Sequence, residues 1–363
     1  MNKDIKWLFS LKEQVLEFLD HQKSQNRAGY YQYSYSGDIY NDESKWNIGS
    51  SVYALKIYYT LGVKKNQDII NTIDYIKSFT HSNGEIYDDF IFKKSFIRNF
   101  ASSVKNGYWD NLTNKRYIRA ETRQAYSSLM LYDEVPEKVS FDFPRTKNDI
   151  ADYLSSMDWS EPWGAGSHFS HLMFFYRLSM LTKTLDTKEY EELVSYSIDW
   201  VNKLRNIKDG GWYKGKQSDR IVVNGAMKII TGLIAVDKSD FEYGKELVDT
   251  CLRSTNDEHA CDNFNIIFVL NYASKLLNRE YRQSEIEQFA LNRLQKYKAH
   301  YKSRQGGFSF YPNYSNKRYY SAKITKGLNE ADIHGTVLFL WGVSIVAQIL
   351  GIEKELGFRE FMT

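Results

Sequence analysis

The sequence predicts an all-α protein with the (α/α)6 toroid architecture, in which six helical hairpins place a ring of inner helices inside a ring of outer helices. Three observations lead to this prediction. The 363 residues include only four prolines, which permits long helices. Apolar residues recur at helical spacing nearly everywhere outside glycine-marked loops, and two kinds of helix alternate along the chain. We expect residues 1–363 to form this single domain.

The outer helices are predicted where a helical stretch has one apolar face and one charged face. The stretch "EYEELVSYSIDWVNKLRNI" is an example. An amphipathic helix of this kind covers a core and turns its charges to solvent. We place the outer helices at residues 3–27, 66–80, 145–156, 188–206, 240–254 and 283–301.

The inner helices are predicted where a polar first turn with small residues is followed by apolar residues on most faces. "WNIGSSVYALKIYYTLG" and "ADIHGTVLFLWGVSIVAQIL" are two of them. A helix that is apolar on nearly every face must be surrounded by other helices. An open solenoid would expose apolar end faces, so closure into a ring explains the pattern better. The first turns lie near residues 46, 121, 166, 224, 262 and 332.

Composition limits the classes of partner. The 48 basic and 45 acidic residues leave a formal charge of +3 without a block of like charge, which gives no general attraction to nucleic acid or to an anionic membrane. Two cysteines, Cys251 and Cys261, do not make a disulfide framework and fit a reducing compartment. The first residues carry charges throughout, and no apolar run is long and uninterrupted enough to span a membrane. We therefore expect a cytoplasmic protein without a membrane span.

Glycine–aromatic turns separate outer helices from the next inner helices. They are "NGYWD" at 106, "DGGWYKG" at 209 and "QGGFSFYPN" at 305. With the helices that follow them, these turns resemble the repeats of the squalene-cyclase and protein-prenyltransferase β-subunit superfamily, whose fold is an α/α toroid. In the last hundred residues, "ACDNFNIIFVLNYASKLL", "RQGGFSFYPN" and "EADIHGTVLFLWGVSIVAQ" resemble the prenyltransferase segment with a zinc-binding cysteine, a Gly-Gly loop and a helix start that carries Asp and His.

Acidic and imidazole side chains on the inner helix heads are the catalytic candidates. Parallel inner helices would gather their N-termini at one mouth, where unpaired N–H groups create a positive potential. His334 is the principal acid or base, while Asp332 and Asp262 would orient or assist it unless they serve only as helix caps. The full catalytic set is His334, Asp332, Asp262, His168, Glu121 and Glu161.

Amides, bases and aromatic rings near the same heads are the substrate-binding candidates. The stretch "DWSEPWGAGSHFSH" supplies tryptophans, an acid and two histidines, which suit the hydroxyl groups and C–H faces of a sugar. The substrate-binding set is Arg123, Trp163, His171, Asn224, Lys228, Asn265 and Trp212. The leading hypothesis is therefore an intracellular acid–base enzyme that acts on a carbohydrate or glycolipid intermediate.

The reaction type stays open at this point. Hydrolysis of a glycoside requires two carboxyl groups across the bond, for which Glu121, Glu161, Asp262 and Asp332 are available. A lyase or an epimerase instead needs a His or Tyr base, with an Arg or Asn that neutralises a carboxylate. His168, His334, Tyr126, Asn224 and Arg123 could supply those groups.

Two alternatives come from other functional classes. The resemblance implies an isoprenoid enzyme, either cyclase-like or prenyltransferase-like, but the chain lacks both Asp-x-Asp-Asp and Asp-Asp-x-x-Asp. The nearest run, "YDDFIFKK", places Asp88 and Asp89 in a predicted solvated loop. The second alternative is a non-catalytic interaction module, in which the polar heads are plain caps and an exposed apolar patch binds the partner.

No organic cofactor is expected, because the chain has no phosphate-binding glycine loop and no paired CxxC. Zinc is the one metal that the resemblance leaves open, with His259, Cys261 and His334 as ligands. The prenyltransferases carry an Asp two residues before the cysteine, where this chain has His259. Cys261 could equally be a small buried hydrophobe. The expected partner is a small-molecule, glycan or prenyl substrate.

Overall fold

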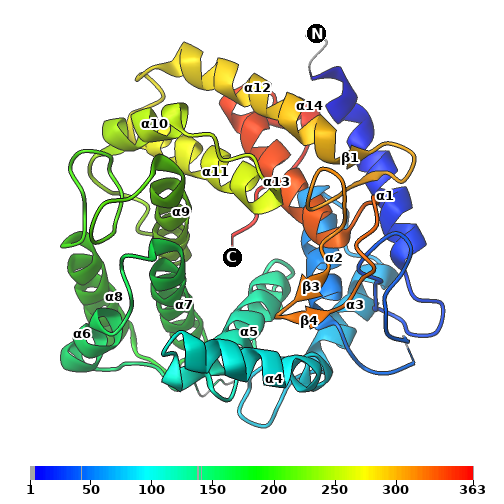
Figure 1. Ribbon diagram of the computed structural model, residues 1–363, viewed down its shortest axis with the longest axis horizontal. Coiled ribbons are helices and arrows are strands. Elements are labelled where there is room, and N and C mark those ends of the chain that lie inside the picture. The colour runs from blue at the N-terminus through cyan, green and yellow to red at the C-terminus, as the bar shows by residue number, and fades with distance from the viewer. Residues whose placement is uncertain (1–4, 42, 137–138, 140, 363) are drawn as a thin grey trace.

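The computed structural model describes residues 5–41, 43–136, 139 and 141–362, and these residues are mostly helical (Figure 1). The all-α prediction is confirmed. Within this part of the chain, no helix combines the length and the apolar character that crossing a membrane requires. The few strands form two antiparallel pairs, β1 (Tyr301–Lys302) with β2 (Gly307–Phe308) and β3 (Arg318–Tyr319) with β4 (Ala322–Lys323).

The helices predicted as inner helices contact one another in chain order. Each contacts the next, and the last, α13, returns to contact the first, α2 (Figure 1). Most of their residues are buried, as expected for helices that are apolar on nearly every face. Their bounds are α2 Ile48–Thr60, α5 Lys115–Met130, α7 Pro162–Leu181, α9 Asp219–Ala235, α11 Ala260–Leu276 and α13 Ile333–Ile349.

Neighbouring helices of this series run parallel. A Cβ atom added at Gly225 of α9 would meet Pro162 of α7, and one added at Gly232 would meet Phe169. The contacts advance in the same direction along both helices, so both begin at the same end. The same order holds between α9 and α11, where Arg220 contacts Asp262 and Asn224 contacts Asn265, and between α11 and α13, where Phe264 contacts Trp341 and Asn271 contacts Gln348.

The amphipathic helices pack on the outside of this series (Figure 1). Helix α3 packs on α2, α8 on α7, α10 on both α9 and α11, and α12 on both α11 and α13. The predicted positions are confirmed, although the first helix begins as a 3₁₀ turn at Lys6–Ser10 and ends at Gln22. The bounds are α1 Leu11–Gln22, α3 Gln67–Lys77, α6 Lys147–Ser155, α8 Thr187–Asn202, α10 Gly244–Arg253 and α12 Gln283–His300, with a short α14 at Glu353–Leu356.

Helix α4 (Asp89–Lys105) corrects the sequence prediction of a solvated loop. Asp88 is fully buried as its N-cap, where the carboxylate accepts hydrogen bonds from the backbone N–H groups of Phe90 and Ile91. The backbone N–H of Asn47 also donates to Asp88. The prediction was therefore wrong for Asp88, because a capping carboxylate is satisfied by backbone donors and needs no water. Asp89 begins the helix and remains exposed.

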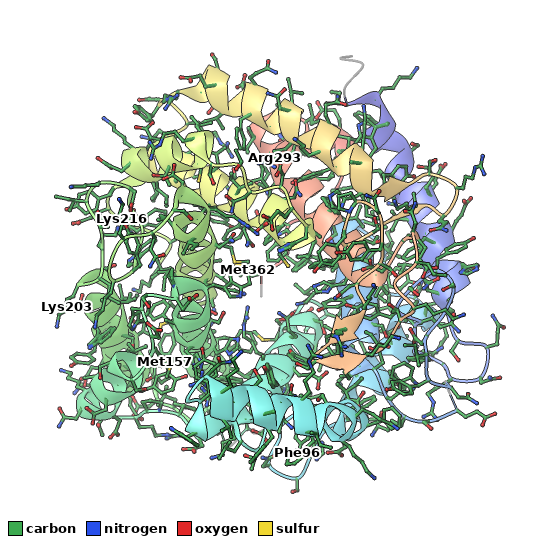
Figure 2. The ribbon with its side chains drawn as sticks, viewed as in Figure 1. Phe96, Met157, Lys203, Lys216, Arg293 and Met362 are labelled. Carbon is green, nitrogen blue, oxygen red and sulfur yellow. The ribbon has the colours of Figure 1, made fainter. Side chains whose placement is uncertain are left out.

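The C-terminal segment lies at the far ends of the inner helices. Phe361 is buried against the ring of Trp341, with 4.2 Å between ring centroids. In Figure 2, Met362 lies near the middle of the molecule, whereas Phe96 of α4 lies on its outer edge. Glu360 accepts hydrogen bonds from Gln348 at 2.7 Å and from Tyr272 at 3.0 Å, near the C-terminal ends of α13 and α11, so this segment lies opposite to their polar heads.

Candidate functional site

His334 lies on the first turn of α13, half-buried, where its ring meets two other polar side chains. The hydroxyl group of Tyr33 lies 2.9 Å from His334 Nδ1. The side-chain amide of Asn316 lies 3.1 Å from the same hydroxyl and 3.3 Å from Nδ1. Because the phenol and the amide can each donate and accept, this trio stabilises His334 with its proton on either ring nitrogen.

Aromatic rings form the walls around His334. Tyr53 of α2 stacks on the imidazole with 4.7 Å between centroids, and Phe310 lies 4.8 Å away on a tilted plane. Burial lowers the pKa of His334 to about 3, so the ring is neutral at neutral pH. Burial also raises the pKa of Tyr33 well above its usual value, which keeps the phenol protonated. The pair is thus an uncharged proton donor and acceptor.

Asp332 stabilises the backbone around this site. It is fully buried as the N-cap of α13 and accepts hydrogen bonds from three backbone N–H groups: Gly335 at 2.7 Å, Phe310 at 2.7 Å and Asn316 at 3.1 Å. Burial raises its pKa to about 7. Two of the three donors belong to residues that contact His334, so Asp332 positions those neighbours rather than facing a substrate itself.

Glu121 of α5 lies on the other side of a group of tyrosines from His334. It is buried and accepts a hydrogen bond from the backbone N–H of Asp88 at 2.9 Å. Burial, together with the neighbouring carboxylate, raises the pKa of Glu121 well above its usual range, and burial raises that of Asp88 to about 6. Tyr319 packs 6.3 Å from Tyr33 and is electrostatically coupled to Glu121.

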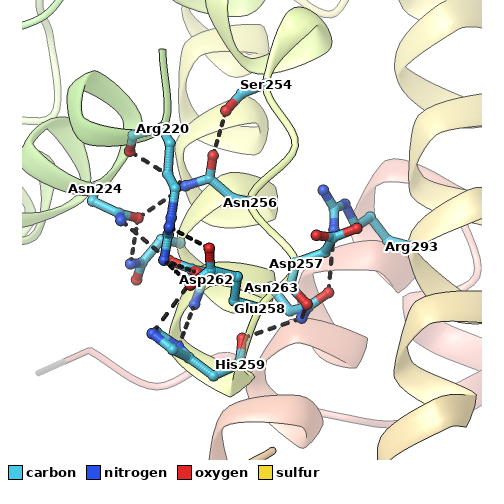
Figure 3. A network of polar contacts seen from close by, with 11 residues as sticks. Arg220, Asn224, Ser254, Asn256, Asp257, Glu258, His259, Asp262, Asn263 and Arg293 are labelled. Atoms are coloured by element: carbon cyan, nitrogen blue, oxygen red, sulfur yellow. Dashed lines mark hydrogen bonds and ion pairs between the residues drawn. The ribbon is translucent and has the colours of Figure 1, made fainter. Parts of the chain in front are cut away.

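Asp262 of α11 lies in a network of polar side chains between α9 and α11 (Figure 3). Arg220 donates to Asp262 at 2.8 Å and forms two parallel hydrogen bonds to Glu258 at 2.6 and 2.7 Å. Asn224 donates to Asp262 at 3.1 Å and accepts from Asn265 at 2.9 Å. We call these five residues the Arg220 network. Three predicted site residues, Asp262, Asn224 and Asn265, are thus brought together by a network in which both carboxylates pair with Arg220.

His259 connects the Arg220 network with the His334 site. Its Nδ1 accepts from the backbone N–H of Asp262 at 3.3 Å, which makes it the N-cap of α11. Its ring stacks on Phe310 with 5.3 Å between centroids, and the ring of Phe310 also contacts His334. The heads of α11 and α13 therefore lie close together, as the parallel arrangement predicts.

The predicted zinc ligands do not form a metal cluster. Among the residues that the structure describes, no group of three or more His, Cys, Asp and Glu side chains is placed to hold a metal ion, so His259, Cys261 and His334 do not make such a site. Cys251 and Cys261 are free thiols. Burial raises the pKa of Cys261 to about 12, which keeps it in the thiol form that metals do not favour.

The two histidines of α7 belong to different surroundings. His168 is buried, and its Nδ1 lies 2.8 Å from the hydroxyl of Tyr153, which also accepts from Arg119 at 2.5 Å. Arg119 and Tyr153 line a cavity of about 890 Å³ between α5, α6 and α7. The pKa of His171 is lowered mainly by burial, and His171 is coupled electrostatically to Arg123 of α5 and also to His168. The structure therefore separates His168 from the His334 site.

Lys228 of α9 and Arg123 of α5 are electrostatically coupled. The ammonium group of Lys228 lies 4.0 Å from the ring centre of Trp163. Burial lowers the pKa of Lys228 to about 8 and that of Arg123 to about 10. Trp163 and Glu161 are exposed at the start of α7. These predicted binding residues thus lie on neighbouring helices, with Glu161 out in solvent.

Trp212 does not lie at the N-terminal ends of the inner helices, where it was predicted from the sequence. It is buried, with its indole N–H donating to Asn202 at 3.0 Å and the guanidinium group of Arg205 3.5 Å above its ring. The glycine–aromatic turn at this position therefore fixes the end of α8 and leaves no face of Trp212 for a substrate.

Several site residues have no counterpart in the sequence prediction. They are Tyr33, Tyr53, Asn316 and Phe310 around His334, and Lys56 in the middle of α2. The sequence contained one indication of such a residue: Lys56 is the only charged residue in the stretch "SSVYALKIYYT".

No family model matches this chain, and no curated protein matches it. The resemblance to squalene cyclases and prenyltransferases stays a prediction.

Proposed function

We propose that the chain is an (α/α)6 toroid enzyme that moves a proton on a carbohydrate or glycolipid substrate, as a lyase or an epimerase, with His334 as its acid and base. The observation that carries the proposal is the 2.9 Å contact between His334 Nδ1 and the Tyr33 hydroxyl. The toroid architecture is supported by the closed series of contacts from α2 to α13 and back, and by the parallel directions of neighbouring helices.

The pair suits proton transfer because His334 is neutral and half-exposed while Tyr33 is buried behind it. With its proton on Nδ1, which donates to the Tyr33 oxygen, the neutral ring takes a proton from a sugar carbon at the outer nitrogen, Nε2, and becomes an imidazolium; the phenol turns its own hydrogen to the Asn316 amide. The imidazolium then gives the Nε2 proton to the leaving-group oxygen in an elimination, or back to the carbanion in an epimerisation, and the ring is neutral again. One side chain can therefore remove a proton and deliver it, as β-elimination and epimerisation both require.

Aromatic walls favour a sugar ring as the group that faces His334. Tyr53 and Phe310 present flat surfaces to the C–H faces of a pyranose. Asn316 and Tyr53 supply polar groups that can bond hydroxyl groups. A rigid framework of this kind orients the reacting carbon without depending on loop movement.

The carboxyl groups are less suited to hydrolysis. That reaction needs two carboxyl groups that face each other across the bond that breaks. Asp332 bonds three backbone N–H groups, and Asp262 is ion-paired. Glu121 is buried, and Glu161 is exposed at the outer start of α7. The imidazole–phenol pair is therefore the better-placed acid–base group.

Incubation of the protein with pools of neutral and acidic oligosaccharides in D2O tests this proposal. An epimerase incorporates deuterium at the reacting carbon, which NMR detects, and a lyase creates an ultraviolet-absorbing double bond. We expect His334→Gln to lower the rate roughly 100- to 10,000-fold. Tyr33→Phe should lower it about 10- to 100-fold, because Nδ1 of the imidazole loses its hydroxyl hydrogen-bond partner.

Tyr58→Phe is the matched control, since its hydroxyl bonds that of Tyr31 at 3.0 Å, outside the site. Its rate should equal that of the wild type. Full activity of His334→Gln on a substrate found in this way would contradict the assignment. The absence of both deuterium exchange and elimination in every pool would contradict the proposed reaction.

A further inference from the structure

Helix α4 exposes a row of apolar side chains to solvent. Ile97 is 84% exposed, and Phe96, Phe100 and Val104 are exposed as well. Phe96, Phe100 and Val104 follow one another at intervals of four residues, and Ile97 lies three residues before Phe100, so all four share one side of the helix. Figure 2 shows Phe96 at the outer edge of the molecule. We call these four residues the α4 ridge.

Beyond its first turn, the buried residues of α4 are polar. They are Ser95, Asn99 and Ser103. The side-chain amide of Asn99 donates to Asn114 at 2.9 Å, and that of Asn111 donates to Ser103 at 3.1 Å. These hydrogen bonds attach α4 to the segment that follows it. Over most of its length, α4 therefore keeps polar side chains inside and shows apolar side chains to solvent.

The preceding outer helix, α3, has the ordinary arrangement. Ile69, Ile73 and Ile76 are among its buried residues. An outer helix normally buries its apolar face and exposes its polar face. An apolar surface that the fold leaves exposed, with charged residues beside it, marks a place where another apolar surface binds.

Four basic residues accompany the α4 ridge. Lys93, Lys94, Arg98 and Lys105 are exposed, and Asp89 is the one acidic residue of α4. In the described part of the chain, none of the four basic residues takes part in a salt bridge. Lys94, Arg98 and Lys105 recur at intervals of four and seven residues, so they line one edge of the ridge. The charge of the whole chain is nearly balanced, but α4 carries a local positive excess.

A further exposed aromatic residue follows α4. Trp109 begins the short 3₁₀ helix η2 (Trp109–Asn111), which packs against α4, and it is 66% exposed. Tryptophan is enriched at the boundary between water and lipid, because its ring is apolar and its N–H group is polar. Exposed apolar side chains, basic residues and a tryptophan thus occur together on α4 and at its C-terminal end.

We propose that α4 docks on the surface of an anionic lipid bilayer, with the α4 ridge among the lipid headgroups and its basic residues beside the phosphates. A basic amphipathic helix lies along such a surface and buries its apolar side at the boundary of the acyl chains. A ridge on one helix is convex, and a lipid surface deforms around it, whereas a protein partner would need a matching groove. The inference does not depend on the proposed reaction.

Flotation with lipid vesicles tests the proposal on the whole protein. The vesicles contain phosphatidylcholine alone, or phosphatidylcholine and phosphatidylglycerol in equal amounts. The wild type should bind the mixed vesicles at least roughly tenfold more tightly than the neutral ones, because each basic residue near an anionic surface contributes a factor of about five. Added salt should weaken this binding, because it screens the charges.

Ile97→Glu should weaken binding to the mixed vesicles roughly tenfold or more, because it places a negative charge in the middle of the α4 ridge. Ile207→Glu is the matched control, since Ile207 is 63% exposed in the loop after α8. It should bind like the wild type. Circular dichroism shows whether each variant is folded, and Phe100→Ser provides a second variant if Ile97→Glu is not.

The double variant Arg98→Gln, Lys105→Gln should weaken binding to the mixed vesicles roughly 25-fold and leave binding to the neutral vesicles unchanged. Its matched control is Lys203→Gln, Lys216→Gln, because both lysines are exposed and lie on another side of the molecule from Phe96 (Figure 2). This control should bind the mixed vesicles within about fivefold of the wild type, and a loss equal to that of the α4 variant would overturn the assignment to α4.

Failure of the wild type to bind the mixed vesicles would overturn the proposal, as would equal binding to both kinds of vesicle or wild-type binding by Ile97→Glu. Sedimentation velocity tests a different occupant of the ridge. A wild-type dimer that Ile97→Glu converts to a monomer, without vesicle binding, would overturn the proposal and assign the ridge to a second copy of the chain. His334→Gln should bind vesicles like the wild type, so this result and the proposed reaction can fail separately.

Discussion

The Arg220 network and the buried lysines Lys56 and Lys228 both place charged side chains on the inner helices, but only the first supplies opposite charges. In the Arg220 network, two carboxylates bond one guanidinium group, and two amides extend the network from Asp262 (Figure 3). Lys56 instead has an amide oxygen as its neighbour, and Lys228 has an aromatic ring. The first arrangement stabilises the junction of two helices. The second leaves two ammonium groups without a carboxylate partner among the described residues.

The two regions differ in whether a buried charge meets an opposite charge. Asp262 accepts from a guanidinium group and an amide, whereas Lys56 and Lys228 form no salt bridge among the described residues. Mutations in the two regions should therefore have opposite effects on stability, because one removes a partner and the other removes a repulsion.

The largest effect is expected in the Arg220 network. Arg220→Leu leaves Asp262, which is 1% exposed, without its cation. Because Arg220 is itself 37% exposed, the loss should be smaller than for a fully buried pair and should lower the free energy of unfolding by about 2–3 kcal/mol. Urea denaturation measures the change. The exposed ion pair of Lys65 with Glu134 provides the control: Lys65→Met should cost less than about 1 kcal/mol, and an equal cost for both variants would show that the network does not differ from a surface pair.

Lys56→Met should have the opposite sign. Replacing an uncompensated buried ammonium group by an apolar chain of similar length should raise the free energy of unfolding of the ligand-free protein by about 2 kcal/mol. The same denaturation experiment measures it. A destabilised variant would mean that Lys56 is satisfied by the protein itself, and the contrast between the two regions would disappear.

The positions of the helices followed from sequence because helical periodicity is a local property. The polar first turns, the apolar bodies and the charged outer faces occur within single segments, and the structure has helices at each predicted place. Helix α4 was missed because "DDFIFKKSFIRNF" mixes charged and aromatic residues. Its cap at Asp88 depends partly on the distant N–H of Asn47, which sequence spacing does not reveal.

The candidate site was found in part. His334 and Asp332 share one helix start, so their proximity follows from local geometry. Tyr33 lies 301 positions from His334 in sequence and Asn316 lies in a loop, and no spacing rule connects them. His168 and His171 looked like a pair at helical spacing, yet packing against α5 and α6 turned His168 towards Tyr153.

The sequence by itself determined the helical class, the alternation of buried and amphipathic helices and the placement of polar residues on the first turns. Hydrophobic burial acts on each segment separately, so its pattern is visible in the chain. Only the tertiary structure decided which polar residues meet. Whether a buried charge finds an opposite charge, as Asp262 does, or only like charges, as Lys56 does, depends on neighbours from other helices, whose distances the order of residues does not encode.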